Sequence, residues 1–102
     1  MLTCSKPALL LVVMSIAGCV SEPHPGELTW QQNCQVCHGV GLAGSPKFGD
    51  KKAWTKRIAR GTESLYGHAI EGWGDMPAKG GNPALSEQEV KHAVDYMVAN
   101  SQ

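Results

Sequence analysis

The sequence lacks three features that would each point to a class of protein. Its longest apolar segment, Ala8–Ala17, has ten residues, whereas a membrane-spanning helix needs about 20. It has no excess of charge, with 9 basic and 9 acidic residues, and no basic run of the kind that binds nucleic acid. It also has no alternation of polar and apolar residues, so no β-strand is predicted.

The short apolar segment suits the hydrophobic region of a secretory signal. The residues Ile16-Ala17-Gly18-Cys19 resemble the lipobox of bacterial lipoproteins, in which the signal is cut before the cysteine and the cysteine is acylated. Residues 1–18 are therefore predicted to be a signal peptide, and Cys19 is predicted to carry a lipid anchor. The alternative is ordinary cleavage after Ala17, which would leave Cys19 as an exposed thiol.

Cleavage before Cys19 would leave 102 − 18 = 84 residues. Residues 19–25 hold two prolines and little apolar material, so we expect the anchor and a tether there, with His24 as a plain linker residue. The remaining domain, residues 26–102, has a small core that is marginal without a cross-link or a bound group. Two cysteines remain to supply one, Cys34 and Cys37.

Helical periodicity and capping residues predict two helices in the first half of this domain. The first runs from Gly26 to about residue 39 and places Trp30 on the same face as the two cysteines. Residues 39–50 form a loop. Asp50 is a good N-cap for the second helix, from about Lys51 to Arg60.

Two more helices are predicted in the second half. The third covers about 63–71, and its apolar face consists of Tyr66, Ala69, Ile70 and Trp73. Residues 72–85 are rich in glycine and proline and form a loop. The last helix begins at a capping box of Ser86 and Glu89, and its apolar stripe consists of Val90, Ala93, Val94, Met97 and Val98. The fold class is therefore predicted to be all-α, with about four helices.

Cys34-Gln35-Val36-Cys37-His38 has the C-x-x-C-H pattern of c-type haem attachment. On a helical turn, thiols three residues apart face the same way and can reach both vinyl groups of one haem, and the next residue brings an imidazole under the iron. A thioredoxin-like disulfide is a competing interpretation, but it expects a βαβ setting. A zinc site would need a further ligand pair at zinc-like spacing, and the sequence has none.

The iron of such a haem needs a sixth ligand for fast electron transfer, and methionine or histidine would serve. The sequence offers Met76, Met97, His68 and His92. Met97 lies on the apolar stripe of the last helix, which favours core packing, and His92 lies off that stripe. His68 lies beside Ala69, and a surface or supporting role is favoured for it. Met76 sits in a glycine-rich loop before a proline, and we expect it to be the ligand.

The segment from Gly26 onward is similar to bacterial class I cytochromes c, and most of all to the cytochrome c5 group. The matching pieces are Cys34–Gly39, Gly44–Lys47, Gly49–Lys51, Ala53-Trp54, Arg57-Ile58, Gly61, His68–Ile70, Met76–Asn82 and Leu85–Val98. The resemblance implies the small class I cytochrome c fold around one haem c, held covalently through Cys34 and Cys37 and ligated by His38 and Met76.

The resemblance also implies supporting roles. The Pro46 carbonyl would bind the outer nitrogen of His38, and Tyr96 would pack on the first helix near Trp30. Trp54 and Arg57 would approach the haem propionates, although Trp54 could equally be a core residue. Many members of the group carry a second cysteine pair in the loop after Met76. Here residues 80–85 have no cysteine, and the loop must be held by Pro83, by Leu85 and by the capped helix.

A haem with both axial positions filled has no open site for a substrate, which indicates a one-electron carrier rather than an enzyme. Redox proteins would be its electron donors and acceptors. The protein is predicted to be a monomer, anchored by lipid on the periplasmic side of a bacterial membrane. The alternative is a soluble protein in the periplasm. Two other functions remain open: a haem c subunit of a redox enzyme, such as a peroxidase or sulfur-compound oxidase, and a haem-free thiol or metal-binding lipoprotein.

Six basic residues crowd one stretch of this chain: Lys47, Lys51, Lys52, Lys56, Arg57 and Arg60. Such a stretch is usually a solvated helix face. Here it could instead meet the haem propionates or an acidic protein partner.

Overall fold

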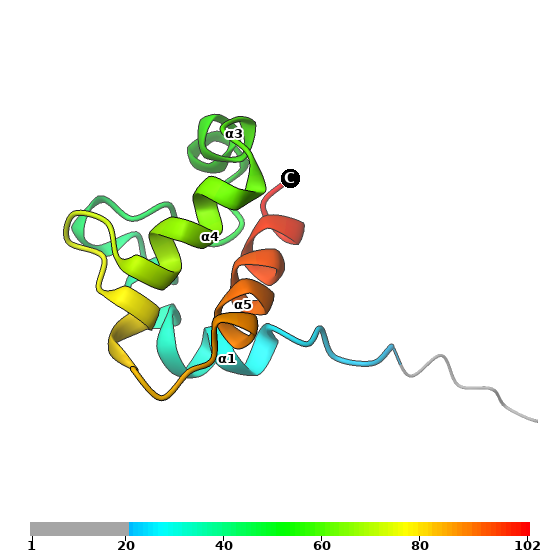
Figure 1. The fold of residues 1–102 in the computed structure, drawn as a ribbon. Coiled ribbons are helices and arrows are strands. Elements are labelled where there is room, and N and C mark those ends of the chain that lie inside the picture. The colour runs from blue at the N-terminus through cyan, green and yellow to red at the C-terminus, as the bar shows by residue number, and fades with distance from the viewer. Residues whose placement is uncertain (1–20) are drawn as a thin grey trace, which may run out of the picture.

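The computed structural model describes residues 21–102, so the predicted signal peptide and Cys19 lie outside the described residues. The described chain is helical, as predicted, and contains no named strand. It has five α-helices, whose arrangement Figure 1 shows. They are α1 (Glu27–Asn33), α2 (Gln35–His38), α3 (Lys51–Ala59), α4 (Thr62–Glu71) and α5 (Glu87–Ala99).

The predicted first helix is in fact two helices, α1 and α2, which meet at Cys34. Cys34 adopts φ −117° and ψ −27°, off the ideal helical values. Its N–H still donates to Trp30 O at 2.9 Å, and its carbonyl accepts from His38 N at 3.0 Å. The axis therefore changes direction at the first cysteine of the C-x-x-C-H motif.

The helix starts are confirmed where a capping side chain was predicted. The Asp50 carboxylate accepts from Ala53 N at 3.1 Å and caps α3. Ser86 and Glu89 form the complete capping box of α5. These bonds are made within three residues, so local sequence is enough to predict them.

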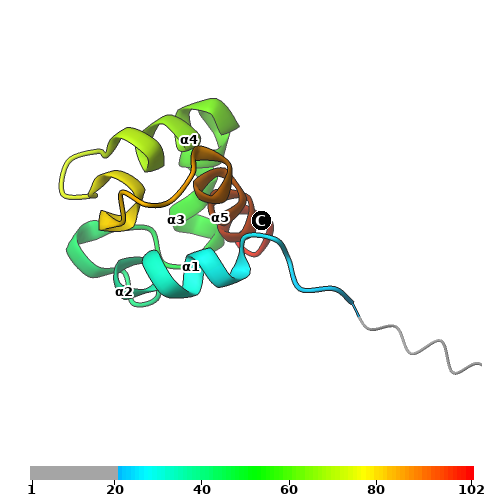
Figure 2. The ribbon, with the colours of Figure 1, turned by 60° about the horizontal axis from the view of Figure 1, so that its bottom comes forward.

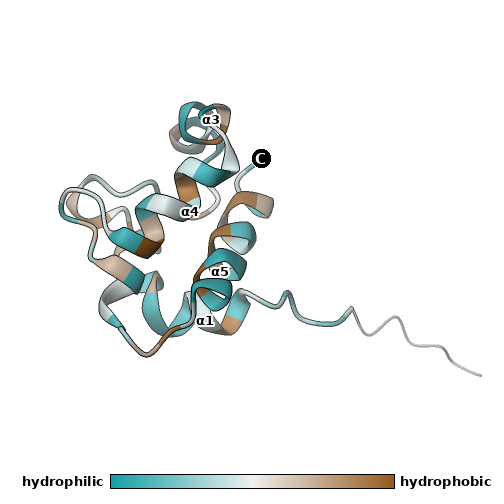
Figure 3. Cartoon of the chain, viewed as in Figure 1, coloured by the Kyte–Doolittle hydropathy of each residue, from teal (hydrophilic) through white to brown (hydrophobic). Residues whose placement is uncertain are grey.

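The core lies on the inward stripe of α5, against which α1 and α4 pack. Val90, Ala93, Val94 and Met97 are buried, and Val98 is partly buried, as the stripe predicted. Polar and apolar residues lie on different sides of α5 (Figure 3). The apolar face predicted for α4 is wrong at Trp73, which lies beyond the helix end and is 63 % exposed.

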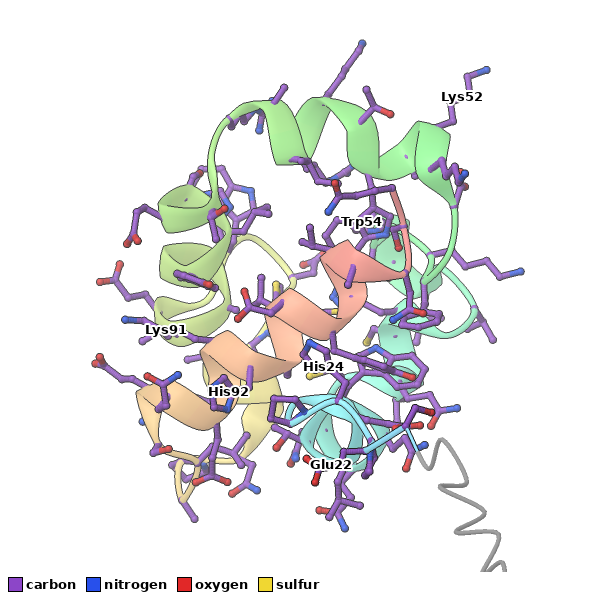
Figure 4. The ribbon with its side chains drawn as sticks, turned by 90° about the vertical axis from the view of Figure 1, so that its right-hand side faces the viewer. Glu22, His24, Lys52, Trp54, Lys91 and His92 are labelled. Atoms are coloured by element: carbon purple, nitrogen blue, oxygen red, sulfur yellow. The ribbon has the colours of Figure 1, made fainter. Side chains whose placement is uncertain are left out.

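The start of the domain is held more firmly than the tether interpretation predicted. His24 Nδ1 accepts from Gly26 N at 3.0 Å, and its ring lies 5.3 Å from that of Tyr96 on α5. His24 lies over α5 beside the folded body (Figure 4). The expectation of a plain linker residue is therefore wrong for His24. Trp30 and Tyr96 pack as predicted, with ring centroids 5.6 Å apart.

Gly26 allows α1 and α5 to approach closely. A methyl group on its Cα would overlap the carbonyl oxygen of His92. Because Gly26 has φ −93° and ψ −5°, ordinary values for any residue, space rather than backbone conformation requires glycine here. Both sides of the contact are backbone, so neither can move without shifting a helix.

Gly26→Ala is therefore expected to lower the free energy of unfolding by about 1–3 kcal/mol, the usual cost of overpacking. The matched control is Gly67→Ala in α4, where a methyl group would meet nothing within 4 Å. That change should stabilise the protein by up to about 1 kcal/mol through helix propensity. Urea unfolding of both variants checks the pair; equal effects would contradict the close-approach explanation.

The predicted loop 72–85 contains short ordered pieces. Trp73 and Met76 exchange two backbone hydrogen bonds, of 3.0 and 2.9 Å. The 3₁₀ helix η2 (Ala78–Gly81) follows and contacts α1 and α4. A second 3₁₀ helix, η1 (Leu42–Gly44), lies in the loop after α2. Within residues 21–102, no helix is both long and apolar enough to cross a membrane.

Candidate functional site

One cavity brings the predicted site residues together. Its volume is about 770 Å³, within the range of about 300–1,000 Å³ typical of sites for small molecules and cofactors. Its walls come from all five α-helices, from η1, from residues 73–77 and from Gly80. Residues 21–25 lead away from the body at the end of α1 that lies far from α2 (Figure 2). Cys34, Cys37, His38 and Met76 all line the cavity.

Both cysteines of the motif lie half-buried on the cavity wall. Burial raises the pKa of the Cys34 thiol to about 11, and the neighbouring Cys37 adds to the rise. A thiol with a raised pKa is protonated at neutral pH and is a poor redox nucleophile. Cys34 is therefore poorly suited to thiol–disulfide exchange, and both cysteine side chains lie where a group in the cavity could be attached to them.

His38 is buried and held in one orientation. Its Nδ1 lies 2.9 Å from Pro46 O, and because a carbonyl oxygen can only accept, Nδ1 must be the donor. The predicted contact of Pro46 is thus confirmed. Burial lowers the pKa of His38, the bond to Pro46 raises it, and the nearby Arg57 cation lowers it. The neutral ring then keeps a lone pair on Nε2, which is what an iron ligand needs.

Three of the four candidates for the sixth ligand line this cavity: Met76, Met97 and His68. Met97 is 2 % exposed and belongs to the core, as predicted. His92 lies on α5 outside the cavity lining, where its Nε2 is 2.8 Å from Gln88 Nε2. Met76 is partly buried and comes from the loop between α4 and η2, so its position depends on backbone contacts rather than on a helix.

Trp54 and the cations of α3 form another part of the wall. Trp54 is buried, and its Nε1 donates to Lys47 O at 2.9 Å, which favours its role as a core residue that also lines the cavity. Arg57 Nη1 donates to Ala53 O. Lys56, Arg57 and Arg60 line the cavity on this side and offer positive charge to an anionic group there.

One aromatic contact at the rim was missed. The rings of His68 and Trp73 are stacked, with centroids 4.0 Å apart and planes 17° apart. The predicted helix ended at residue 71, as observed, but Trp73 was still assigned to its apolar face although it lies two residues beyond that end.

The cavity, the donor set and the burial fit a haem c. Two cysteine side chains, an imidazole oriented by Pro46 and a methionine all line the cavity. Thioether formation, nitrogen ligation and sulfur ligation are the chemistries that these side chains supply.

Comparisons with known proteins give the same assignment. Residues 21–97 match the family model described as cytochrome C oxidase, cbb3-type, subunit III. The chain is 45% identical over 80 residues to cytochrome c-555 of Chlorobaculum thiosulfatiphilum, covering 74% of this chain and 93% of the relative. It is 37% identical over 68 residues to cytochrome c5 of Ectopseudomonas mendocina, covering 65% of this chain and 78% of the relative.

Solved structures agree. A chain in the crystal structure of an electron-transfer complex of nitrite reductase with cytochrome c superposes with a TM-score of 0.73 at 38% identity, covering 79% of this chain and 98% of that chain. Cytochrome c6 from the diatom Phaeodactylum tricornutum gives a TM-score of 0.57 at 28% identity, covering 76% and 91%. The chain therefore belongs to the class I c-type cytochromes, which carry a covalently bound haem c, and its Cys34–Cys37 pair fits their attachment motif.

Proposed function

We propose that this protein is a one-electron carrier whose single haem c is ligated by His38 and Met76. The observation that carries the proposal is the shared cavity: the thiols, the oriented His38 and the Met76 loop all line it. The haem supplies reversible one-electron chemistry between Fe(III) and Fe(II) when bound. The chain's residues attach it, orient its ligands and exclude water from it.

The ferric holoprotein tests this proposal. We expect a pyridine haemochrome spectrum of covalent haem c, and the weak red absorption band of methionine–Fe(III) ligation. Rapid binding of cyanide or CO without that band would instead favour the redox-enzyme alternative, because an enzyme needs an open position on the iron. A thiol-redox function is disfavoured by the raised pKa of Cys34.

We propose that the carrier is a monomer tethered at Cys19 on the periplasmic side of a bacterial membrane, with residues 1–18 removed and the domain beginning near residue 26. Support comes from the sequence of residues 16–19, which resembles a lipobox. The intact mass of purified protein, read for a diacylglycerol modification, is the direct measurement. A soluble periplasmic carrier would show the unmodified mass.

Its partners are redox proteins, and we propose that an acidic partner surface meets the cations of α3. Lys51, Lys52 and Lys56 are exposed, and Asp50 is the only acidic residue between positions 47 and 60. Lys52 points away from the body, whereas Trp54 lies beneath the same helix (Figure 4). Because α3 also lines the cavity, a partner on these cations would lie near its rim.

Reversing the charge of two α3 lysines should slow oxidation of the haem by an anionic reagent more than oxidation by a cationic one. We expect Lys52→Glu/Lys56→Glu to lower the rate of oxidation by the hexacyanoferrate(III) anion about tenfold at low salt, relative to oxidation by a cationic cobalt complex. The loss should shrink as salt is added. The control is Lys91→Glu/Gln88→Glu near the start of α5, where Lys91 lies away from Lys52 (Figure 4); it lowers the net charge by three units, against four for the α3 double. Equal effects of both doubles would contradict a local role for α3.

A further inference from the structure

The η2 segment lies directly on the end of α1. Gly80 adopts φ 62°, and a methyl group on it would overlap the backbone oxygen of Asn33, with the carbonyl carbon at 3.1 Å. Any larger residue would therefore push η2 off α1. Glycine here serves a close approach between two backbones.

Two amide side chains join the same two segments. Asn82 Nδ2 donates to Asn33 Oδ1 at 3.0 Å, across 82 − 33 = 49 positions of sequence. Neither amide is free to turn, because Asn82 Oδ1 accepts from Ala84 N at 3.1 Å and Asn33 Nδ2 donates to Thr29 O at 3.0 Å. A partly buried amide pair that is fixed at both ends is a specific contact.

The loop beyond η2 is closed onto itself. Lys79 Nζ donates to Leu85 O at 2.8 Å, and Leu85 is buried. Pro83, which the sequence predicted to hold this loop, is exposed. The predicted packing of Leu85 and the predicted cap of α5 are both observed, and polar contacts that were not predicted add to them.

The contact between η2 and the end of α1 lies between the two segments that carry the predicted haem ligands. Asn33 directly precedes Cys34, and η2 directly follows Met76 and Pro77. Asn33, Gly80 and Met76 all line the cavity. The contact thus joins the segment that carries the haem-attachment motif to the segment that carries the methionine.

We propose that Asn33, Gly80 and Asn82 are positioning residues that set how often Met76 leaves the iron. The proposal rests on the proposed ligation by Met76. The chain from Glu71 to Ser86 has no cysteine to cross-link it, so noncovalent contacts must hold the methionine in place. Removing one hydrogen bond should raise the population of the open loop about two- to tenfold.

Imidazole entry into the ferric holoprotein measures that opening. In stopped-flow experiments at saturating imidazole, the rate is limited by departure of the methionine. We expect Asn82→Ala to raise this rate about two- to tenfold. Asn33→Asp, which keeps an acceptor for Asn82, should stay closer to wild type than Asn33→Leu. The control is Asn100→Ala, whose side chain bonds Tyr96 O elsewhere on α5.

A double-mutant cycle separates positioning from general stability. Asn33→Ala and Asn82→Ala should be non-additive in the imidazole rate, because they remove one shared bond. If Asn82→Ala does not yield holoprotein, Asn82→Asp replaces it, since it keeps the acceptor for Ala84 N and loses the donor. Wild-type rates in Asn82→Ala, or full additivity in the cycle, would overturn the proposal. A wild-type protein without the red methionine band would overturn Met76 ligation instead.

Discussion

Cys34→Ala/Cys37→Ala is expected to abolish covalent haem and, with it, the cooperatively folded domain. The cavity has a volume of about 770 Å³. Without a group that fills this space, the side chains around it lose the packing contacts that the group would make with every surrounding helix. A small domain has a free energy of unfolding of only about 5–15 kcal/mol. The haem is thus part of the core.

The measurement is a pyridine haemochrome assay on the exported protein, together with thermal unfolding followed by circular dichroism. Gln35→Ala/Val36→Ala is the matched control, because these exposed residues lie between the two cysteines. The control should keep its haem and a cooperative transition. Covalent haem in the double-cysteine variant would show that attachment lies elsewhere in the chain.

Met76→Leu is expected to remove the sixth ligand while keeping an apolar side chain of similar size. The red methionine–Fe(III) band should disappear, imidazole should bind without the slow opening step, and the reduction potential should fall. Axial ligands set haem potentials over a range of about 0.8 V, so the fall should be readily measured by redox titration. Because methionine ligation raises the reduction potential of a haem, its loss should lower that potential.

Met97→Leu is the control for this prediction, because Met97 also lines the cavity but lies buried on α5. Because Met97→Leu conserves side-chain volume, it should lower the free energy of unfolding by less than about 1.5 kcal/mol. The red methionine–Fe(III) band should remain. If the band is lost in Met97→Leu and kept in Met76→Leu, Met97 is the sixth ligand of the iron. A wild-type spectrum of bis-histidine ligation would point to His68.

Local features of the sequence determined much of this protein. The caps at Asp50 and Ser86, the buried stripe of α5 and the all-α class depend on residues within a few positions of one another. The C-x-x-C-H motif is local in the same sense, since one helical turn places its thiols and imidazole together. The Pro46 contact was predicted through resemblance to known cytochromes, and the structure confirms it.

The tertiary structure alone decided the contacts between residues far apart in the chain. His24 packs on Tyr96, and Asn82 bonds Asn33 across 49 positions. Hydrophobic periodicity predicts which face of a helix is buried, but not which neighbour covers it. The cavity itself is a property of the assembled helices. Local propensity therefore specifies the helices and the attachment motif, and packing specifies the cavity that brings Cys34, His38 and Met76 together.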